Sequence, residues 1–154
     1  MQKSRIALVT VLVAAAATLV SCGVGAQAKP VPITVYKSPT CGCCAKWVEL
    51  VRREFGRPVE MVDDANRAVL QKRFGMPANL SSCHTAIIDG LVFEGHVPIA
   101  DMKRALAQRP KGVRGLAVPG MPIGSPGMEA PGRPAQHYTV TAFGPGGTKV
   151  YAQH

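Results

Sequence analysis

The chain has 154 residues, with 18 Lys and Arg against 9 Asp and Glu, a formal net charge of +9. This length suits one small domain, and a single Trp means that the core has to be built mainly from aliphatic side chains. Residues 1–28 hold two basic residues and no acidic one, which leaves 16 against 9, or +7, for the remainder. That charge is scattered, with no basic run interleaved with aromatic residues, so we expect no nucleic-acid partner.

The first 28 residues have the pattern of an export signal. Lys3 and Arg5 give it a basic start, and an apolar run over residues 6–20 follows and ends in small residues. That run is too short and too rich in alanine for a typical membrane-spanning helix. We therefore predict that the chain is exported and works in the periplasm.

The end of this signal has competing interpretations. Ala26-Gln27-Ala28 is an A-x-A site that predicts cleavage before Lys29, and we favour it slightly. Leu19-Val20-Ser21-Cys22 resembles a lipobox, in which Cys22 would be lipidated and become the new N-terminus. An uncleaved anchor is a less favoured alternative. In each case we expect one exported domain over residues 29–154, which contacts the membrane only through the signal or a lipid anchor.

Strand and helix patterns alternate after the signal. Short β-branched runs predict strands, and apolar residues at helical spacing predict helices. The predicted elements are a strand at 33–36, a helix at 43–55, a strand at 58–62, a helix from Asp63 or Asp64 to Phe74, strands at 83–88 and 91–94 joined by the hairpin signal Asp89-Gly90, and a helix at 99–108. The order β-α-β-α-β-β-α predicts an α/β fold, a thioredoxin-like four-stranded mixed sheet with helices on both faces.

The composition changes after Pro110, so residues 110–154 form a C-terminal extension. Residues 115–132 are rich in Gly, Pro and Met and predict a loop. Residues 138–143 and 149–152 alternate in character on either side of a Gly-rich turn, which predicts a terminal β-hairpin.

Four cysteines remain once Cys22 is removed or acylated. Cys41, Cys43 and Cys44 lie within four positions, and Cys83 follows further on. An even number of cysteines in an exported protein usually indicates disulfides, but adjacent Cys43 and Cys44 are awkward to bridge to each other. Cys41 and Cys44 form a C-x-x-C at a predicted helix start, where free N–H groups lower thiol pKa values. The cluster therefore predicts a reactive site in preference to a set of structural disulfides.

Two kinds of chemistry fit this cluster. In disulfide exchange, Cys41 attacks and Cys44 resolves, and Cys43 is only a competing partner. In metal binding the crowding is an advantage, because neighbouring thiolates can bridge more than one soft ion, and thiolate and thioether ligands select Cu(I). Zinc is the second metal candidate, since four sulfurs suit a tetrahedral site.

Further candidate ligands lie outside the C-x-C-C segment. Cys83 begins a predicted strand that should lie beside the helix start, so we expect it to face the cluster. Alternation along a strand argues against Cys83 and His84 pointing the same way, so a hydrogen-bonded role for His84 is weighed equally with a ligand role. His96 follows the next strand, where a turn role is at least as well supported. Met121 and Met128 occupy a Pro-rich loop and predict a lid over a soft-metal site.

Four segments of the sequence, in order, resemble the exported CopG copper-resistance proteins, a family long described as a domain of unknown function and distinct from the DNA-binding repressor of the same name. The segments are Val35 to Trp47 with the motif Cys41-Gly42-Cys43-Cys44, Ser82-Cys83-His84-Thr85-Ala86, Glu94-Gly95-His96-Val97-Pro98, and Gly115 to Glu129. The resemblance runs over about residues 33–143. It implies a thioredoxin-like envelope protein associated with copper or silver resistance. It also implies copper ligands at Cys41, Cys43, Cys44 and Cys83, with the Met and His residues as further candidates.

We therefore expect a metal-binding protein in preference to an enzyme. It would hold one or more Cu(I) ions in a multi-cysteine site for copper resistance. We expect its partners to be other envelope copper-handling proteins. Redox activity at the same sulfurs could be part of that function. The alternative is a thiol–disulfide oxidoreductase without a physiological metal, which needs neither Cys43 nor the methionine loop. A structural zinc module is a third hypothesis and predicts unfolding on chelation.

Overall fold

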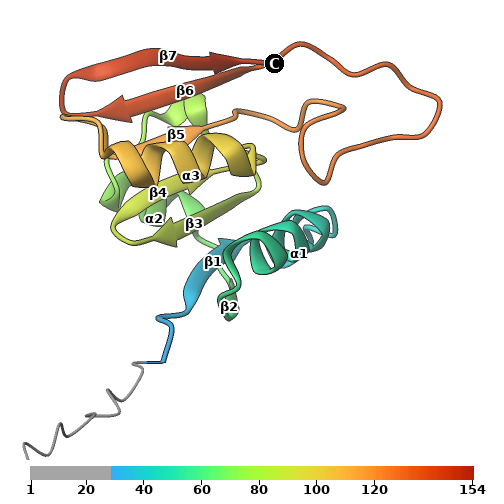
Figure 1. Ribbon diagram of the computed structural model, residues 1–154, viewed down its shortest axis with the longest axis horizontal. Helices are drawn as coiled ribbons and strands as arrows, with labels where there is room; N and C mark the ends of the chain where they lie inside the picture. The colour runs from blue at the N-terminus through green and yellow to red at the C-terminus, as the bar shows by residue number, and fades with distance from the viewer. Residues whose placement is uncertain (1–28) are drawn as a thin grey trace, which may run out of the picture.

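The structure is a computed structural model, and it describes residues 29–154 (Figure 1). The predicted export signal, including Cys22, lies outside these residues. The described elements are β1 (Ile33–Lys37), α1 (Cys44–Phe55), β2 (Val59–Asp63), α2 (Arg67–Arg73), the 3-10 helix η1 (Ala78–Leu80), β3 (His84–Ile88), β4 (Leu91–Glu94), α3 (Ile99–Gln108), β5 (Gly115–Ala117), β6 (Thr139–Gly144) and β7 (Gly147–Gln153).

All the described strands join one mixed sheet in the order β2-β1-β3-β4-β5-β6-β7. β1 pairs with β2 and β4 pairs with β5 in parallel, and the other neighbours are antiparallel. In the β1–β3 pair, Lys37 lies opposite His84. This register places the start of β3 beside the end of β1, where the chain turns toward the cysteines.

The mixed α/β class is confirmed, and the predicted order of elements from β1 to α3 agrees with the structure. The four strands predicted for the first part of the chain correspond to β1–β4, but the sheet does not end there. Within residues 29–154 it has seven strands, because β5 forms inside the segment predicted as a loop and links the C-terminal hairpin to β4.

The sheet has helices on both faces, with a mainly aliphatic core under α1 and α3. Trp47, Val48 and Val51 of α1 and Met102 of α3 pack on the same core as Phe93 of β4. On the other face, a second cluster gathers around η1 and the end of α2 and includes Met76, Leu80, Val92, Ala117 and Phe143. Successive residues of β4 therefore alternate between the faces, as the pleat of a strand requires.

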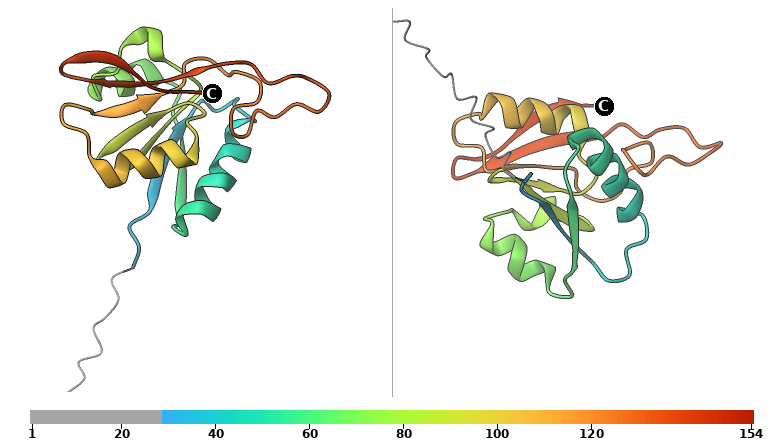
Figure 2. Two further views of the ribbon diagram at one scale, coloured as in Figure 1. Left: turned by 45° about the horizontal axis from the view of Figure 1, so that its top comes forward. Right: turned by 60° about the horizontal axis from the view of Figure 1, so that its bottom comes forward.

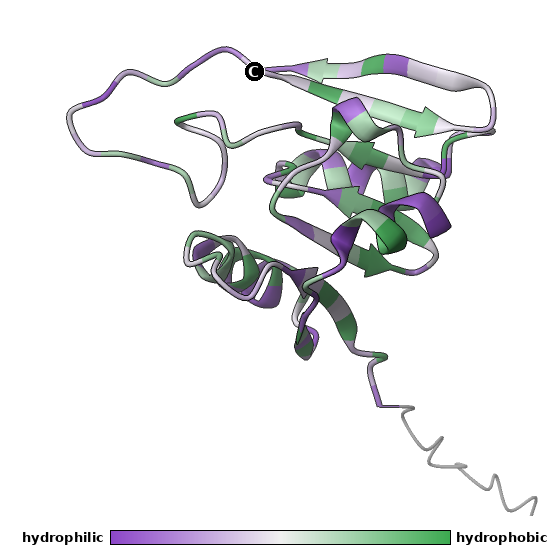
Figure 3. Ribbon diagram, turned by 180° about the vertical axis from the view of Figure 1, so that it is seen from behind, coloured by the Kyte–Doolittle hydropathy of each residue, from purple (hydrophilic) through white to green (hydrophobic). Residues whose placement is uncertain are grey.

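Hydrophilic and hydrophobic residues are interspersed along the helices in Figure 3. None of the helices within residues 29–154 is both long and apolar enough to cross a membrane.

The segment between β5 and β6 extends away from the sheet and passes the start of α1 (Figures 1 and 2). The approach is close at Gly127, where a Cβ atom would lie 2.8 Å from the backbone nitrogen of Trp47. Gly127 also has a φ of +82°, a conformation that favours glycine. This segment, residues 118–138, is called the methionine loop below, and it is held against the first turn of α1.

Candidate metal centre

The first three cysteines lie at the turn from β1 into α1. The backbone N–H of Cys41 donates to the carbonyl of Ser38 at 3.0 Å, which bends the chain back over the end of β1. Cys44 is the first residue of α1, and in the described part of the chain the side chain of the preceding N-cap residue, Cys43, makes no capping hydrogen bond. Cys41 and Cys44 form a disulfide, whereas Cys43 and Cys83 are free thiols. The disulfide joins the two ends of the predicted C-x-x-C.

Cys83 joins this group from the loop before β3. Its Sγ lies 3.6 Å from Sγ of Cys44, and Sγ of Cys43 lies 3.3 Å from Sγ of Cys41. All four sulfurs lie within 4.8 Å of one another. The structure thus brings together the four cysteines that the sequence singled out, although they lie up to 42 positions apart (83 − 41).

Two histidines adjoin Cys83 from the side of α1. Nδ1 of His84 lies 3.3 Å and Nε2 of His96 lies 3.5 Å from Sγ of Cys83. Cys83, His84 and His96 therefore form a second group of donors within 4.8 Å. The predicted alternation between Cys83 and His84 does not hold, because β3 begins only at His84. Cys83 precedes the strand and is free to turn toward the same face.

His84 has an unusual environment for a polar side chain. It is fully buried, with its ring 4.4 Å from that of Trp47 and 5.0 Å from that of His96. Among the described residues, its Nε2 has no hydrogen-bond partner. Burial, with the charges of His96 and Arg67, lowers the pKa of His84 to about 3. The ring is therefore neutral near pH 7 and keeps a lone pair for a metal ion.

His96 is oriented by the methionine loop. Its Nδ1 lies 2.9 Å from the carbonyl oxygen of Pro126 and must donate the proton in that hydrogen bond. This fixes the tautomer with an unprotonated Nε2, which points at the sulfur of Cys83. Burial lowers the pKa of His96 as well. A ring held by one N–H while the other nitrogen faces a site is the usual arrangement of histidine ligands.

Cys83 is disfavoured as a thiolate while no cation is near. Burial and the neighbouring Cys43 raise the pKa of its thiol to about 11. A bound cation reverses this effect, because it replaces a repulsive neighbour with an attractive one and displaces the proton.

The two predicted methionines are placed differently. Sδ of Met121 lies 3.8 Å from Sγ of Cys43, and the Met121 side chain is 52% exposed. Met128 lines a hollow beside Cys43 together with Lys46 and Ile123. Met121 thus adjoins the sulfur cluster directly, whereas Met128 borders its entrance.

A buried carboxylate on the opposite face of the sheet supports this site, and the sequence analysis did not find it. The side chain of Glu94 accepts hydrogen bonds from the backbone N–H of Ser82 at 2.7 Å and from Arg67 and Gln71 at 2.9 Å each. Ser82 in turn donates to the carbonyl of Gly120 at 2.6 Å. Glu94 therefore fixes the residue before Cys83 and, through it, the start of the methionine loop. The sequence signal that could have identified Glu94 is an acidic residue at the end of an apolar strand.

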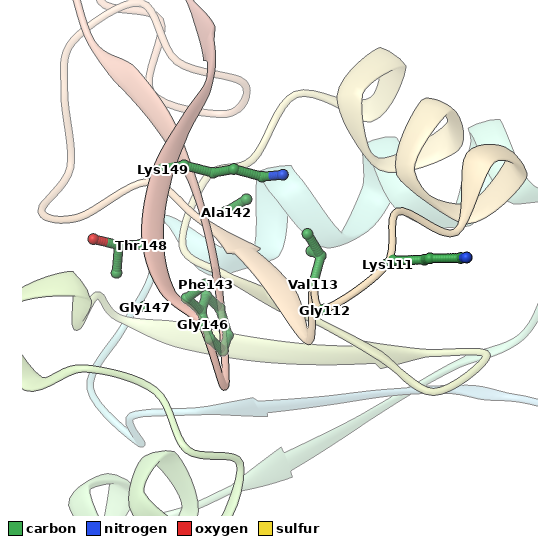
Figure 4. A pocket seen from close by; sticks show the side chains of 9 residues that line it. All are labelled: Lys111, Gly112, Val113, Ala142, Phe143, Gly146, Gly147, Thr148 and Lys149. Carbon is green, nitrogen blue, oxygen red and sulfur yellow. The ribbon is translucent and has the colours of Figure 1, made fainter.

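A separate pocket lies between the β6–β7 hairpin and the connection from α3 to β5, away from the cysteines. It has a volume of about 160 Å³, and Lys111 and Lys149 border it (Figure 4). Its lining, as far as residues 29–154 form it, contains no cysteine or histidine.

The fold and the site define a mixed α/β protein whose cysteine and histidine donors are grouped as a metal ion requires. Two solved structures, described as forms 1 and 2 of copper resistance protein CopG, are each 37% identical to this chain and cover 82% of it. They match over 98% and 99% of their own chains, with TM-scores of 0.73 and 0.72. A family model described as a protein of unknown function, DUF411, matches residues 80–128. No curated protein matches the chain.

The chain therefore belongs to the CopG family of copper-resistance proteins, as the resemblance of its four sequence segments implied.

Proposed function

We propose that this protein binds copper as Cu(I) in the periplasm and thereby contributes to copper resistance. The observation that carries the proposal is the convergence of four cysteine sulfurs within 4.8 Å, with the imidazoles of His84 and His96 against Cys83. Sulfur and imidazole donors suit soft and borderline ions, and crowded thiolates favour Cu(I). The relatives described as copper resistance proteins support copper over zinc.

The donors divide into two groups that share Cys83. One group has four sulfurs with Met121 at its edge, and the other has Cys83, His84 and His96. Because a thiolate can bridge two ions, Cys83 can belong to both groups at once. We infer a capacity of more than one Cu(I), held inside a thioredoxin-like unit made of β1–β4, α1 and α3.

The Cys41–Cys44 disulfide makes this capacity dependent on redox state. Two electrons and two protons convert the disulfide into two thiols, so the reduced protein offers four thiols where the oxidised one offers two. The disulfide is also the observation that favours the second candidate function, thiol–disulfide exchange without a metal. In that function Cys43 and Met121 have no role.

Copper loading of a Cys43→Ser variant tests the proposal. The reduced wild type and the variant would be loaded anaerobically, and the copper-to-protein ratio and the X-ray absorption spectrum recorded. We expect fewer bound ions and fewer sulfur neighbours per ion in the variant, because Cys43 is a ligand. An unchanged ratio would exclude the polythiolate site, and efficient disulfide exchange by the variant without copper would favour the alternative.

A further inference from the structure

A groove lies on the exposed side of the sulfur cluster, between the first turn of α1 and the methionine loop. It consists of two adjoining hollows of about 410 and 570 Å³. Both hollows are lined by Lys46, Ile123, Glu129, Ala130 and Arg133, so they form one continuous depression. Gly42 and Cys43 line one end. The groove therefore leads to a free thiol of the proposed copper site.

The lining of this groove combines a soft donor, an apolar wall and a net positive charge, from Lys46 and Arg133 against Glu129. Ile123 and Met128 supply the apolar part. Among residues 29–154, neither Lys46 nor Arg133 forms an ion pair. The acidic residue of the groove, Glu129, accepts the backbone N–H of Gly127 at 3.0 Å, so one of its oxygens is engaged within the loop.

We propose that this groove binds a small thiol that carries carboxylates, of the γ-glutamyl tripeptide class, and that this thiol delivers Cu(I) to Cys43. The inference rests on the proposed function. The carboxylates would pair with Lys46 and Arg133, and a guanidinium binds a carboxylate through two parallel hydrogen bonds. A hollow of about 410 Å³ is within the size range of small-molecule sites.

Delivery is a ligand exchange without a change in oxidation state. The thiolate of Cys43 forms a bond to the Cu(I) of the incoming complex, one bond between that Cu(I) and the donor thiol breaks, and the donor leaves as a thiolate. No electron is transferred. Exposed Met121, 3.8 Å from Cys43, can hold the ion while the second donor leaves. Half-buried Cys83 and, in protein whose Cys41–Cys44 disulfide has been reduced beforehand, buried Cys44 then complete the site.

Binding is tested first without copper, using the S-methylated tripeptide, which keeps both carboxylates but cannot transfer a metal or exchange disulfides. Isothermal titration calorimetry on the copper-free protein should give saturable binding. K46Q/R133Q should weaken binding at least about tenfold, because two charge pairs are lost. The matched control is K111Q/K149Q, which removes the same charge from the pocket of Figure 4 and should bind like the wild type. Absence of saturable binding, or equal binding by both variants, would overturn the proposal.

Transfer is tested next by stopped-flow measurement with two donors, the Cu(I) complex of the tripeptide and that of uncharged dithiothreitol. K46Q/R133Q should slow transfer from the tripeptide about tenfold, within the range of electrostatic effects on association, and leave transfer from dithiothreitol unchanged. Equal slowing with both donors would mean that the two cations act on the copper site itself and not on the ligand. If neither donor loads the wild type with copper, the proposed function is contradicted. That result differs from the outcomes above, which contradict only the proposal that the groove binds the tripeptide.

Discussion

At the scale of single residues, His84 connects the fold to the site. Its ring is fully buried against Trp47 and His96, and within the described part of the chain its Nε2 lacks a hydrogen-bond partner. An unpaired buried polar group costs free energy, and such a cost is typical of groups that serve a function. The other ring nitrogen, Nδ1, lies 3.3 Å from Sγ of Cys83 and is the one placed to bind a metal ion. Because such an ion binds the folded protein and not the unfolded chain, we expect copper binding to stabilise the fold and offset this cost.

Burial of His84 makes the stability of the copper-free protein dependent on pH. Its folded pKa of about 3 lies below the ordinary histidine value of 6.5, so the unfolded state binds the proton more readily. The stabilising contribution is present above pH 6.5 and is lost as the pH falls toward 3. Relative to His84→Phe, the wild type should lose roughly 5 kcal/mol across this window, of which roughly 3 kcal/mol is lost above pH 4.

The measurement is urea unfolding of both proteins at steps between pH 7 and pH 4. His137→Asn, which changes an exposed histidine, should follow the wild type at every pH. Parallel curves for the wild type and His84→Phe would show that His84 is protonated as easily in the folded as in the unfolded protein.

At the scale of elements, the methionine loop and α1 form the site together. Gly127 allows their contact, since a Cβ there would lie 2.8 Å from the nitrogen of Trp47. Gly132 lies in the same loop with a similar positive φ, but nothing lies within 4 Å of a Cβ at that position. Comparing substitutions at the two glycines therefore separates the free-energy cost of a side chain at positive φ from the cost of the close contact with α1.

Gly127→Ala should destabilise the protein by roughly 2 kcal/mol more than Gly132→Ala, as overpacking in a close contact does. It should also weaken Cu(I) binding, because the loop that carries Met121 and orients His96 is pushed from α1. Urea unfolding and a Cu(I) competition titration measure the two effects. Equal effects of both substitutions on both quantities would mean that the contact with α1 does not position the site.

Sequence patterns predicted the longer elements well, for identifiable reasons. α1 and α3 show apolar residues at helical spacing, and Asp89-Gly90 indicates the β3–β4 hairpin. β5 was missed because it has three residues, begins with glycine and shows no alternation. Its strand conformation depends on pairing with β4 and β6, which are distant in sequence.

The parts of the site that follow from the spacing of residues in the sequence were predictable. The parts that depend on how the folded chain packs were not. Three cysteines in four positions indicate a site by themselves, and the order of the strands brings Cys83 to them. The shared direction of Cys83 and His84 depends on the residue at which β3 begins, which patterns do not resolve to one position. The acidic residue at the end of β4 was a sequence signal for Glu94, but its hydrogen bond from the backbone N–H of Ser82 links distant positions, and no local pattern predicts that partner.

At the scale of the whole molecule, one end of the sheet carries the proposed function. The cysteines and the histidines gather beside the methionine loop, near the end of β1 and the start of β3, whereas the pocket beside Lys149 lies at the turn of the β6–β7 hairpin (Figure 4).

The predicted export signal bears on where this molecule works. We expect the mature protein in the periplasmic fraction, beginning at Lys29, and mass spectrometry of its N-terminal peptide measures this. A lipid-modified Cys22 in the membrane fraction would instead establish a tethered protein.

The central claim is that four sulfurs from two distant segments form one copper site. It is tested most directly by anaerobic Cu(I) titration of the fully reduced protein from Lys29 onward, against a competing chelator, beside Cys83→Ser. We predict tight binding of two or more Cu(I) ions by the wild type and loss of that capacity in the variant, because Cys83 belongs to both donor groups. Weak binding of a single ion, equal in the two proteins, would contradict the account and leave the C-x-x-C to act alone.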